Sequence, residues 1–273
     1  MAKTVCDLLG MSFNEPVSAR VSLDLFQKRG VDNPDGWGIA FYQDGHLQVV
    51  KEAAPADDSV LFDFMERYHR SHTIVTHVRR STRGGRSYLN THPFYRAVTH
   101  DSLHREYTFA HNGTLTTHHE LPFGTYTPLG ETDSERMFCH ILDEVQRRSI
   151  SEWDEKDFRF LAHLLRRLNQ GENTLNCIFS DGVHLFCYSD KNDHNNGLRF
   201  VEQSSPWQPV ELASPDEHLG RIDIRSDSPE RYQRGYIVST RILGSKTWTE
   251  FGGGELIAFK RGEIVHPRER ATV

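Results

Sequence analysis

The chain has 273 residues, which is long enough to bury a large hydrophobic core but leaves the number of domains open. Its formal net charge of −6 is spread along the chain without a clustered basic face, which argues against nucleic acid as a partner. No stretch approaches the ~18 apolar residues of a membrane helix. The first residues carry one lysine and no long apolar run, so they do not form a secretory signal. We therefore expect a cytoplasmic protein with no membrane partner.

The cysteine pattern excludes two common uses of this residue. Cys6, Cys139, Cys177 and Cys187 lie far apart without CxxC spacing, which fits neither a disulfide scaffold nor a zinc site. Cys177 and Cys187 stand among apolar residues and are predicted to be small buried hydrophobes. We expect no metal site and no cofactor.

The order of the predicted elements favours an α+β sandwich. Short runs rich in aromatic and β-branched residues predict strands at 5–9, 37–42, 47–51, 73–79, 107–111, 174–180, 184–188, 199–201, 235–240 and 255–260. Helices are predicted at 21–29, 59–68, 133–148 and 153–168. Strands with helices bunched between them are typical of layered α+β folds. The polar segment 214–234 lacks clear periodicity and is interpreted as a surface excursion, and no linker divides residues 1–273, so we expect a single domain.

Several short motifs each have a local structural interpretation. Asn112-Gly113 follows a predicted strand, and by itself predicts a hairpin turn because Asn-Gly readily takes positive φ. Asp133 begins a predicted helix, where Thr132 and Glu135 have the spacing of a capping box. Alone, Cys6 would be a buried strand cysteine. None of these signals is specific alone.

The arginines at the end of the strand 73–79 have two interpretations. Taken by themselves, Arg79 and Arg80 are most simply interpreted as solvent-exposed residues at the rim of a sheet. The functional alternative is a bidentate clamp for a carboxylate. An anion in the first turn of a helix, as at Asp133, is favoured by the helix dipole and could hold an ammonium group.

In order and spacing, these motifs closely resemble the class II glutamine amidotransferases, a branch of the N-terminal nucleophile hydrolases. The motifs that carry the resemblance are Cys6 to Gly10, Arg29-Gly30, Asp35 to Gly38, His77-x-Arg79-x-x-Thr82, Asn90 to Pro93, His111-Asn112-Gly113, Glu131 to Glu135 and, near the end, Gly253 to Leu256. All but the last fall in about the first half of the chain. The resemblance implies a four-layer αββα sandwich.

The resemblance also implies a role for each matched residue. Cys6 would be the nucleophile and its own α-amine the general base, since an α-amine has a pKa of about 7.7–8.0. The Asn112 side chain and the Gly113 backbone N–H would form the oxyanion hole. Arg79 would bind the α-carboxylate of glutamine and Asp133 its α-ammonium, with Thr82 and Asn90 supporting the pocket.

Two features depart from the family pattern. Residues 1–5 precede Cys6, and an amide-linked Cys6 nitrogen has no basic lone pair. Three explanations are open: a propeptide is cut after Val5, a GUG codon at Val5 is the true initiator, or the protein is a degenerate relative. We favour the second explanation, because it yields the N-terminus typical of the family without a protease. Arg80 and Arg83 replace an aromatic residue and a histidine of the sugar-phosphate synthase branch, which favours the small stand-alone branch.

Three functions follow from this resemblance. The leading hypothesis is a glutamine amidohydrolase that forms a γ-glutamyl thioester on Cys6 and delivers ammonia to an acceptor protein. The second is hydrolysis of another γ-glutamyl amide, because Arg79 and Asp133 would hold the glutamyl end of either substrate. The third is a non-catalytic glutamine-binding or regulatory subunit, which only the residues ahead of Cys6 support.

Overall fold

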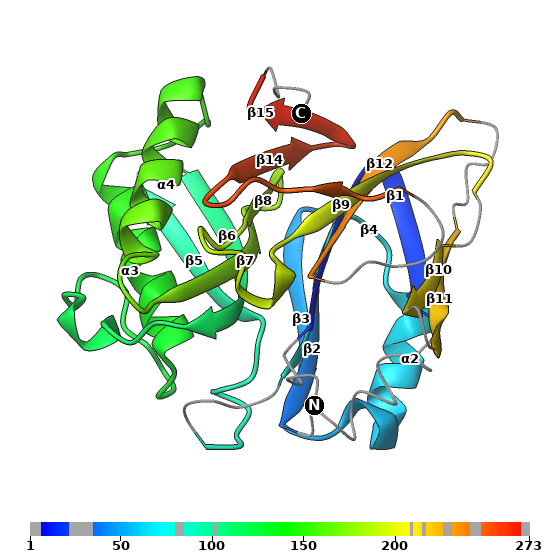
Figure 1. The fold of residues 1–273 in the computed structure, drawn as a ribbon, viewed down its shortest axis with the longest axis horizontal. Helices are drawn as coiled ribbons and strands as arrows, with labels where there is room; N and C mark the ends of the chain where they lie inside the picture. The colour runs from blue at the N-terminus through cyan, green and yellow to red at the C-terminus, as the bar shows by residue number, and fades with distance from the viewer. Residues whose placement is uncertain are drawn as a thin grey trace.

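The computed structural model of the chain describes residues 7–21, 35–79, 85–100, 103–207, 210–214, 217–225, 231–240 and 247–268. Within them, two antiparallel sheets face each other, with helices on their outer sides (Figure 1). This is the expected α+β sandwich with the layer order αββα.

The first sheet contains nine strands, and its central strand is β1. Seven strands follow the order β13-β9-β12-β1-β4-β2-β3, and β11 pairs with β1 and with β10. Their bounds are β1 Asp7–Val21, β2 Gly36–Gln43, β3 His46–Glu52, β4 Ser71–Arg79, β9 Arg199–Ser204, β10 Val210–Ser214, β11 Glu217–Arg225, β12 Arg234–Ser239 and β13 Thr249–Glu250.

The second sheet contains six strands in the order β15-β14-β8-β7-β6-β5. Their bounds are β5 Phe94–His100, β6 Leu103–Thr114, β7 Thr174–Ser180, β8 His184–Tyr188, β14 Leu256–Lys260 and β15 Glu263–His266. The helices are α2 Val60–Tyr68, α3 Asp133–Arg147 and α4 Glu155–Leu168, with short 3-10 helices η1 Ala56–Asp58, η2 His118–Glu120 and η3 His194–Asn196.

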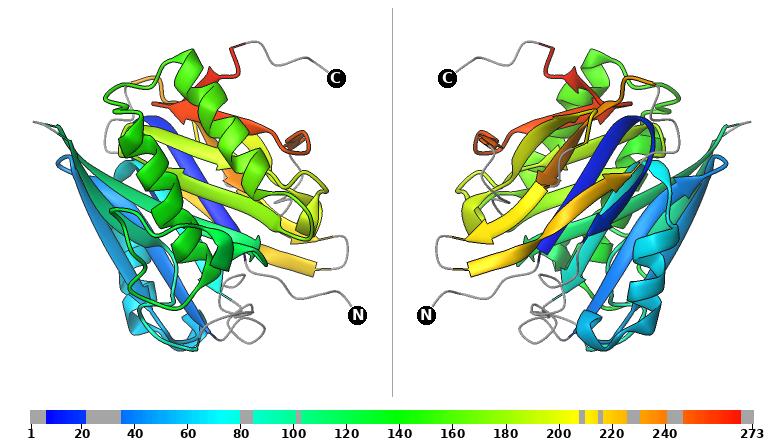
Figure 2. Two further views of the ribbon diagram at one scale, coloured as in Figure 1. Left: turned by 90° about the vertical axis from the view of Figure 1, so that its left-hand side faces the viewer. Right: turned by 90° about the vertical axis from the view of Figure 1, so that its right-hand side faces the viewer.

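Three separate apolar clusters fill the three spaces between the layers. One joins α2 to the nine-stranded sheet, with Phe62 packed edge-on against Trp37 at 4.6 Å between ring centroids. The second lies between the six-stranded sheet and helices α3 and α4 (Figure 2, left). The third lies between the sheets and includes Leu8, Val75 and Ile178. Each helix layer buries one apolar face, and each sheet is covered on one face by helices and on the other by the second sheet, which gives the layer order αββα.

Two buried cysteines behave as the sequence predicts. Cys177 and Cys187 lie on β7 and β8, both fully buried in the apolar clusters. Burial raises the pKa of both thiols well above its usual value. Both side chains therefore serve as small core hydrophobes rather than as reactive thiols.

The expected surface excursion at 214–234 is wrong for its described part. β10 and β11 form an antiparallel hairpin, and β11 continues onto the second half of β1 through Ser18↔Arg225 to Val21↔Ile222. The register of β1 on β4 shifts between Ser12 and Val17, which lets one long strand serve two partners. The helix expected at 21–29 lies outside the described residues except for Val21, which ends β1.

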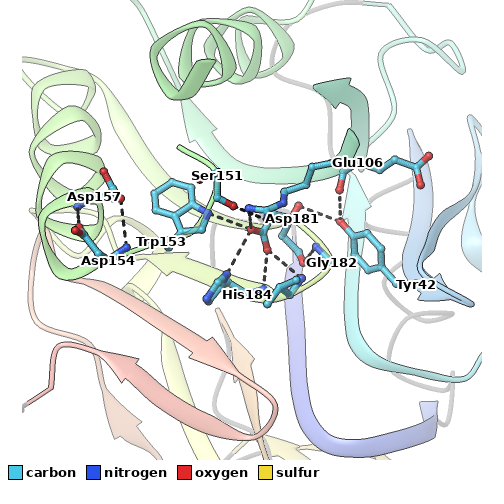
Figure 3. A network of polar contacts seen from close by, with 12 residues as sticks. Tyr42, Glu106, Ser151, Trp153, Asp154, Asp157, Asp181, Gly182 and His184 are labelled. Carbon is cyan, nitrogen blue, oxygen red and sulfur yellow. Dashed lines mark hydrogen bonds and ion pairs between the residues drawn. The ribbon is translucent and has the colours of Figure 1, made fainter. Parts of the chain in front are cut away.

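A buried carboxylate ties the β7–β8 turn to the start of α4 (Figure 3). Asp181 accepts hydrogen bonds from Trp153 Nε1 at 3.0 Å and Arg105 Nη1 at 3.1 Å. Its other oxygen accepts the backbone N–H groups of Val183 and His184. Burial alone would raise the pKa of Asp181, but contacts with His184 and Arg105 outweigh it and hold the pKa below its usual value.

Candidate active site

Asn112 and Gly113 lie inside β6, so the predicted hairpin turn is wrong. They pair with Asn176 and Leu175 of β7, and the ladder continues to Thr114↔Thr174. Pairing with β7, sixty residues later, keeps the chain extended where local preference favours a turn. A Cβ at Gly113 would lie 2.1 Å from the Thr174 carbonyl oxygen, so only glycine permits this close pairing.

Asp133 is held beside the end of β6. It is the first residue of α3, and Thr132 caps the helix by accepting the Glu135 backbone N–H at 3.1 Å. Asp133 Oδ2 accepts the Leu115 backbone N–H at 2.5 Å, and only 3% of the residue is exposed. This contact brings the predicted ammonium-binding carboxylate close to the predicted oxyanion hole.

The predicted capping box at this helix is only half formed. The Glu135 carboxylate does not return to the Thr132 backbone; instead it pairs with Arg96 at 2.6 Å and accepts the Gly130 N–H at 2.7 Å. Glu135 is 1% exposed, and a carboxylate so deeply buried is stabilised more by a cation than by a backbone amide. The capping interaction therefore comes from Thr132 alone.

His111 connects β6, β7 and the first turn of α3. Its Nε2 lies 3.0 Å from the Thr174 carbonyl oxygen, and its Nδ1 lies 2.9 Å from Ser134 Oγ. Burial lowers the pKa of His111, so the neutral ring donates from Nε2 and accepts the Ser134 hydroxyl at Nδ1. Asn112 follows His111 in the chain, and Asp133 precedes Ser134. The contact between His111 and Ser134 therefore sets the spacing between Asn112 and Asp133.

Arg79 ends β4 on the other sheet and is only 3% exposed, so its interpretation as a solvated rim is wrong. Its carbonyl oxygen accepts the Asp35 N–H at 3.3 Å. The preceding residue, Val78, is the register partner of Asp7, the first described residue of β1. Asp7, the residue that follows Cys6, therefore lies at the end of this sheet where Arg79 is found.

Two buried histidines, to which the sequence analysis assigned no role, link the two sheets. The rings of His77 and His92 are in tilted contact, with 4.3 Å between centroids and 38° between the ring planes. Burial, with the charges of Arg79 and His111, lowers the pKa of His77 to about 3. Burial also lowers the pKa of His92, with smaller effects from His77, His111 and Arg79. Both rings are therefore neutral. The sequence signal that could have identified these two histidines is their position inside matched motifs, His77 in His-x-Arg and His92 in Asn-x-His-Pro.

The glycines of the Asp35-Gly36-Trp37-Gly38 motif make room for the segment that carries His92. A Cβ at Gly36 would lie 2.9 Å from the Thr91 side chain, and one at Gly38 would lie 2.2 Å from the His92 carbonyl oxygen. The backbone of this segment therefore lies directly on β2.

Asn90 and Lys51 hold the same segment from its other sides. Asn90 donates to the Gly85 carbonyl oxygen at 2.9 Å and accepts the Glu131 N–H at 2.8 Å, and its supporting role in the pocket stays a prediction. Lys51, which the sequence analysis missed, donates to the Thr91 carbonyl oxygen at 2.6 Å. Burial lowers the pKa of Lys51 to about 8.

The structure thus gathers Asn112, Gly113 and Asp133 around one end of β6. On the facing sheet, His77 lies two residues before Arg79 on β4 and contacts the His92 ring. Cys6 and Thr82 lie outside the described residues, as do Arg29, Gly30, Arg80 and Arg83. Within the described ranges, no group of three His, Cys, Asp or Glu side chains could hold a metal ion. The helices described there include none with the length and apolar character needed to cross a membrane.

The fold is that of an N-terminal nucleophile hydrolase. The glutamine phosphoribosylpyrophosphate amidotransferase of Bacillus subtilis, at 14% identity, shares the fold with a TM-score of 0.56 over 94% of this chain and 48% of its own. The family model for class II glutamine amidotransferases matches residues 5–273, and the chain belongs to this family. Hydrolysis of a glutamine amide is the reaction common to its members.

Individual relatives extend over nearly the whole chain. An uncharacterized protein of Methanocaldococcus jannaschii is 36% identical over 98% of this chain and 73% of its own. YafJ of Escherichia coli, named as a candidate glutamine amidotransferase, is 32% identical over 96% of this chain and 100% of its own. The crystal structure of a predicted glutamine amidotransferase from Pseudomonas aeruginosa is 27% identical, with a TM-score of 0.70 over 95% of this chain and 99% of its own.

Proposed function

We propose that the protein is a glutaminase that cleaves the side-chain amide of glutamine through a γ-glutamyl thioester on Cys6. The Cys6 thiolate attacks the amide carbon, and the free α-amine of Cys6 moves the proton to the departing ammonia. Water then attacks the thioester, which releases glutamate and restores the thiol. The ammonia is proposed to pass to an acceptor protein.

The observation that best supports this proposal is the geometry around the end of β6. Asn112 and Gly113 have the donor types that stabilise a tetrahedral oxyanion, a side-chain amide and a backbone N–H. Asp133, held by Leu115 and through Ser134 by His111, adds a buried carboxylate for an ammonium group. Arg79 is proposed to bind the α-carboxylate, and Thr82 to line the same pocket, so that the substrate is recognised as an α-amino acid.

The first experiment compares a form of the protein that begins at Cys6 with a form that retains residues 1–5. The form beginning at Cys6 is expected to release ammonia and glutamate from glutamine, and Cys6→Ala in that form is expected to abolish release. Hydrolysis retained by Cys6→Ala, measured with a coupled glutamate assay, would contradict the proposed nucleophile. Equal rates for the two forms would contradict the α-amine as the base.

A panel of γ-glutamyl amides tests the choice of substrate in the same assay. Glutamine is expected to have the highest kcat/KM. A larger amide with a kcat/KM at least tenfold higher would assign the enzyme to that γ-glutamyl compound instead. No turnover of any panel member by the form beginning at Cys6 would favour a non-catalytic subunit.

A further inference from the structure

The orientation of the Asn112 amide decides whether this residue can act as an oxyanion donor. Rotation of the amide by 180° exchanges the NH₂ group for a carbonyl oxygen, which would repel a developing negative charge. A terminal amide torsion is broad and roughly two-fold, so rotamer preference alone does not select one orientation. A neighbouring group must distinguish the two ends of the amide.

Asn195 provides such a group, although it is 83 residues away in the chain. Its Nδ2 donates to Asn112 Oδ1 at 2.9 Å. Because two NH₂ groups cannot hydrogen-bond to each other, this contact turns the Asn112 NH₂ away from Asn195. Asn112 is only 2% exposed, so water competes little for its carbonyl oxygen.

The backbone around Asn195 is held in an unusual conformation. Asp193, Asn195 and Asn196 have φ values of 52°, 56° and 66°. Positive φ is uncommon outside glycine but is tolerated best by Asn and Asp, the residue types found here. Such local strain persists only where surrounding contacts maintain it, and it is frequent at functional sites.

The contacts that maintain this conformation come from the strand beside Asn112. Asn176, the register partner of Asn112, donates from Nδ2 to the His194 carbonyl oxygen at 2.7 Å. Asn176 Oδ1 in turn accepts the Asp190 N–H at 2.9 Å. Asp190 accepts the backbone N–H groups of Leu175 and Asn192 at 2.7 Å and 2.8 Å. Buried amides and one carboxylate thus link β7 to the loop that carries Asn195.

We propose that Asn195 is a positioning residue that fixes the Asn112 side chain with its NH₂ group toward the oxyanion. The inference rests on the proposed function, because it assigns no reaction of its own to Asn195. It acts on the transition state through Asn112, so its loss should lower kcat and leave substrate binding nearly unchanged.

The test compares Asn195→Asp with Asn195→Gly in the form that begins at Cys6. The introduced carboxylate has nearly the same shape but can only accept, so it attracts the Asn112 NH₂ group and reverses the amide. Glycine removes the side chain and tolerates the positive φ. We expect kcat to fall about 100-fold in Asn195→Asp, at the lower end of the range for loss of one oxyanion donor. In Asn195→Gly the fall should be smaller, about tenfold, because the Asn112 amide can still take either orientation. KM should change less than about threefold, as expected of a contact used only in the transition state.

The rank order separates positioning from a purely structural role. If Asn195 served only to shape the loop, the nearly isosteric Asn195→Asp would be the milder variant, and that result would overturn the proposal. Asn196→Gly is the matched control, because Asn196 is exposed, has a similar φ and makes no hydrogen bond to Asn112 among the described residues. Its kcat should equal that of the wild type.

A double-mutant cycle tests whether Asn195 acts through Asn112. In an Asn112→Ala background, Asn195→Asp should cause no further loss of kcat, because no amide remains to be oriented. A further loss equal to that in the wild-type background would overturn the proposal.

Neutron diffraction supplies a measurement that does not depend on turnover, because it distinguishes an amide nitrogen from an oxygen. We expect the Asn112 amide to be reversed in Asn195→Asp relative to the wild type. An unchanged amide would overturn the inference even if glutamine is hydrolysed. Conversely, a reversed amide in a protein that hydrolyses no γ-glutamyl amide would support the positioning by Asn195 and reject the proposed function.

Discussion

Asp133 shows how a single residue can combine a structural and a binding role. It occupies the first turn of α3, where the helix dipole favours a negative charge. One of its carboxylate oxygens already accepts the Leu115 N–H. A carboxylate anchored in this way keeps its position while the remaining acceptor capacity is available to a substrate ammonium group.

Replacement of Asp133 by Asn tests this binding role. The amide oxygen can still accept the Leu115 N–H, so the fold should be retained, while the charge that attracts the ammonium group is lost. A hydrogen bond to a charged group contributes about 1.5–3 kcal/mol, so kcat/KM for glutamine should fall roughly 10- to 150-fold. Steady-state kinetics measure the change.

The matched control is Glu144→Gln on the same helix. Glu144 pairs with Arg147, whose side chain is 61% exposed, and such surface ion pairs contribute little. The kcat/KM of Glu144→Gln should therefore stay within a factor of two of the wild-type value, which corresponds to about a few tenths of a kcal/mol. Equal kinetics for Asp133→Asn and the wild type would remove Asp133 from the binding site.

At the scale of elements, the β7–β8 turn and the start of α4 act as one unit through Asp181 (Figure 3). The carboxylate satisfies an arginine, an indole N–H and two backbone N–H groups at once. Removal of such a carboxylate leaves several buried donors unpaired, which costs more than the loss of any single bond. By contrast, Asp154 caps α4 at an exposed position.

We therefore expect Asp181→Ala to lower the free energy of unfolding by about 3–5 kcal/mol, the cost of breaking a buried charged network. Asp154→Ala, the comparison variant, should lower it by about 0.5–2 kcal/mol, the usual cost of losing a helix cap. Urea unfolding followed by circular dichroism measures both. Equal losses in the two variants would show that the Asp181 network does not act as a unit.

At the scale of the whole molecule, the two sheets meet through buried polar groups as well as apolar ones. The rings of His77 and His92 are buried in contact with each other, and His111 is buried on β6. Burial lowers the pKa of each of the three rings, His77 to about 3. Their burial in the neutral form makes the stability of the sandwich dependent on pH.

The sign of this dependence follows from proton binding. The unfolded histidines have a pKa of about 6.5, so between pH 6.5 and pH 3 the unfolded state binds more protons than the folded state. The free energy of unfolding should therefore fall as the pH is lowered below 6.5. His77 alone should lower the free energy of unfolding by about 1.4 kcal/mol between pH 7.5 and pH 5.5.

Urea unfolding at pH 7.5 and pH 5.5 measures this effect. Replacement of His119, whose side chain is 67% exposed, by Gln should leave the pH dependence unchanged. Replacement of His92 by Phe should reduce the pH dependence, because one buried titrating group is removed while the ring contact with Phe94 is kept. A stability that does not change between the two pH values would contradict the burial of neutral histidines.

The sequence by itself determined much of the element pattern and the family. The short apolar and aromatic runs of strands such as β2 and β7, and the four-residue apolar repeat of α3, are local properties that burial between the layers requires. The Thr132 cap could likewise be predicted, because a helix cap depends on residues three apart. The motif order was sufficient to recognise the family and hence the layered fold.

Only the tertiary structure decided where the polar residues of the site meet. Asn-Gly favours a turn locally, but pairing with β7 extends β6 through Asn112 and Gly113. β5 and the β10–β11 hairpin were missed because partner strands, rather than local pattern, stabilise them. The contact from Asn195 to Asn112 joins residues 83 positions apart across a loop of positive φ. No local pattern contains such a contact, because it depends on how β7 and the loop after β8 are packed together.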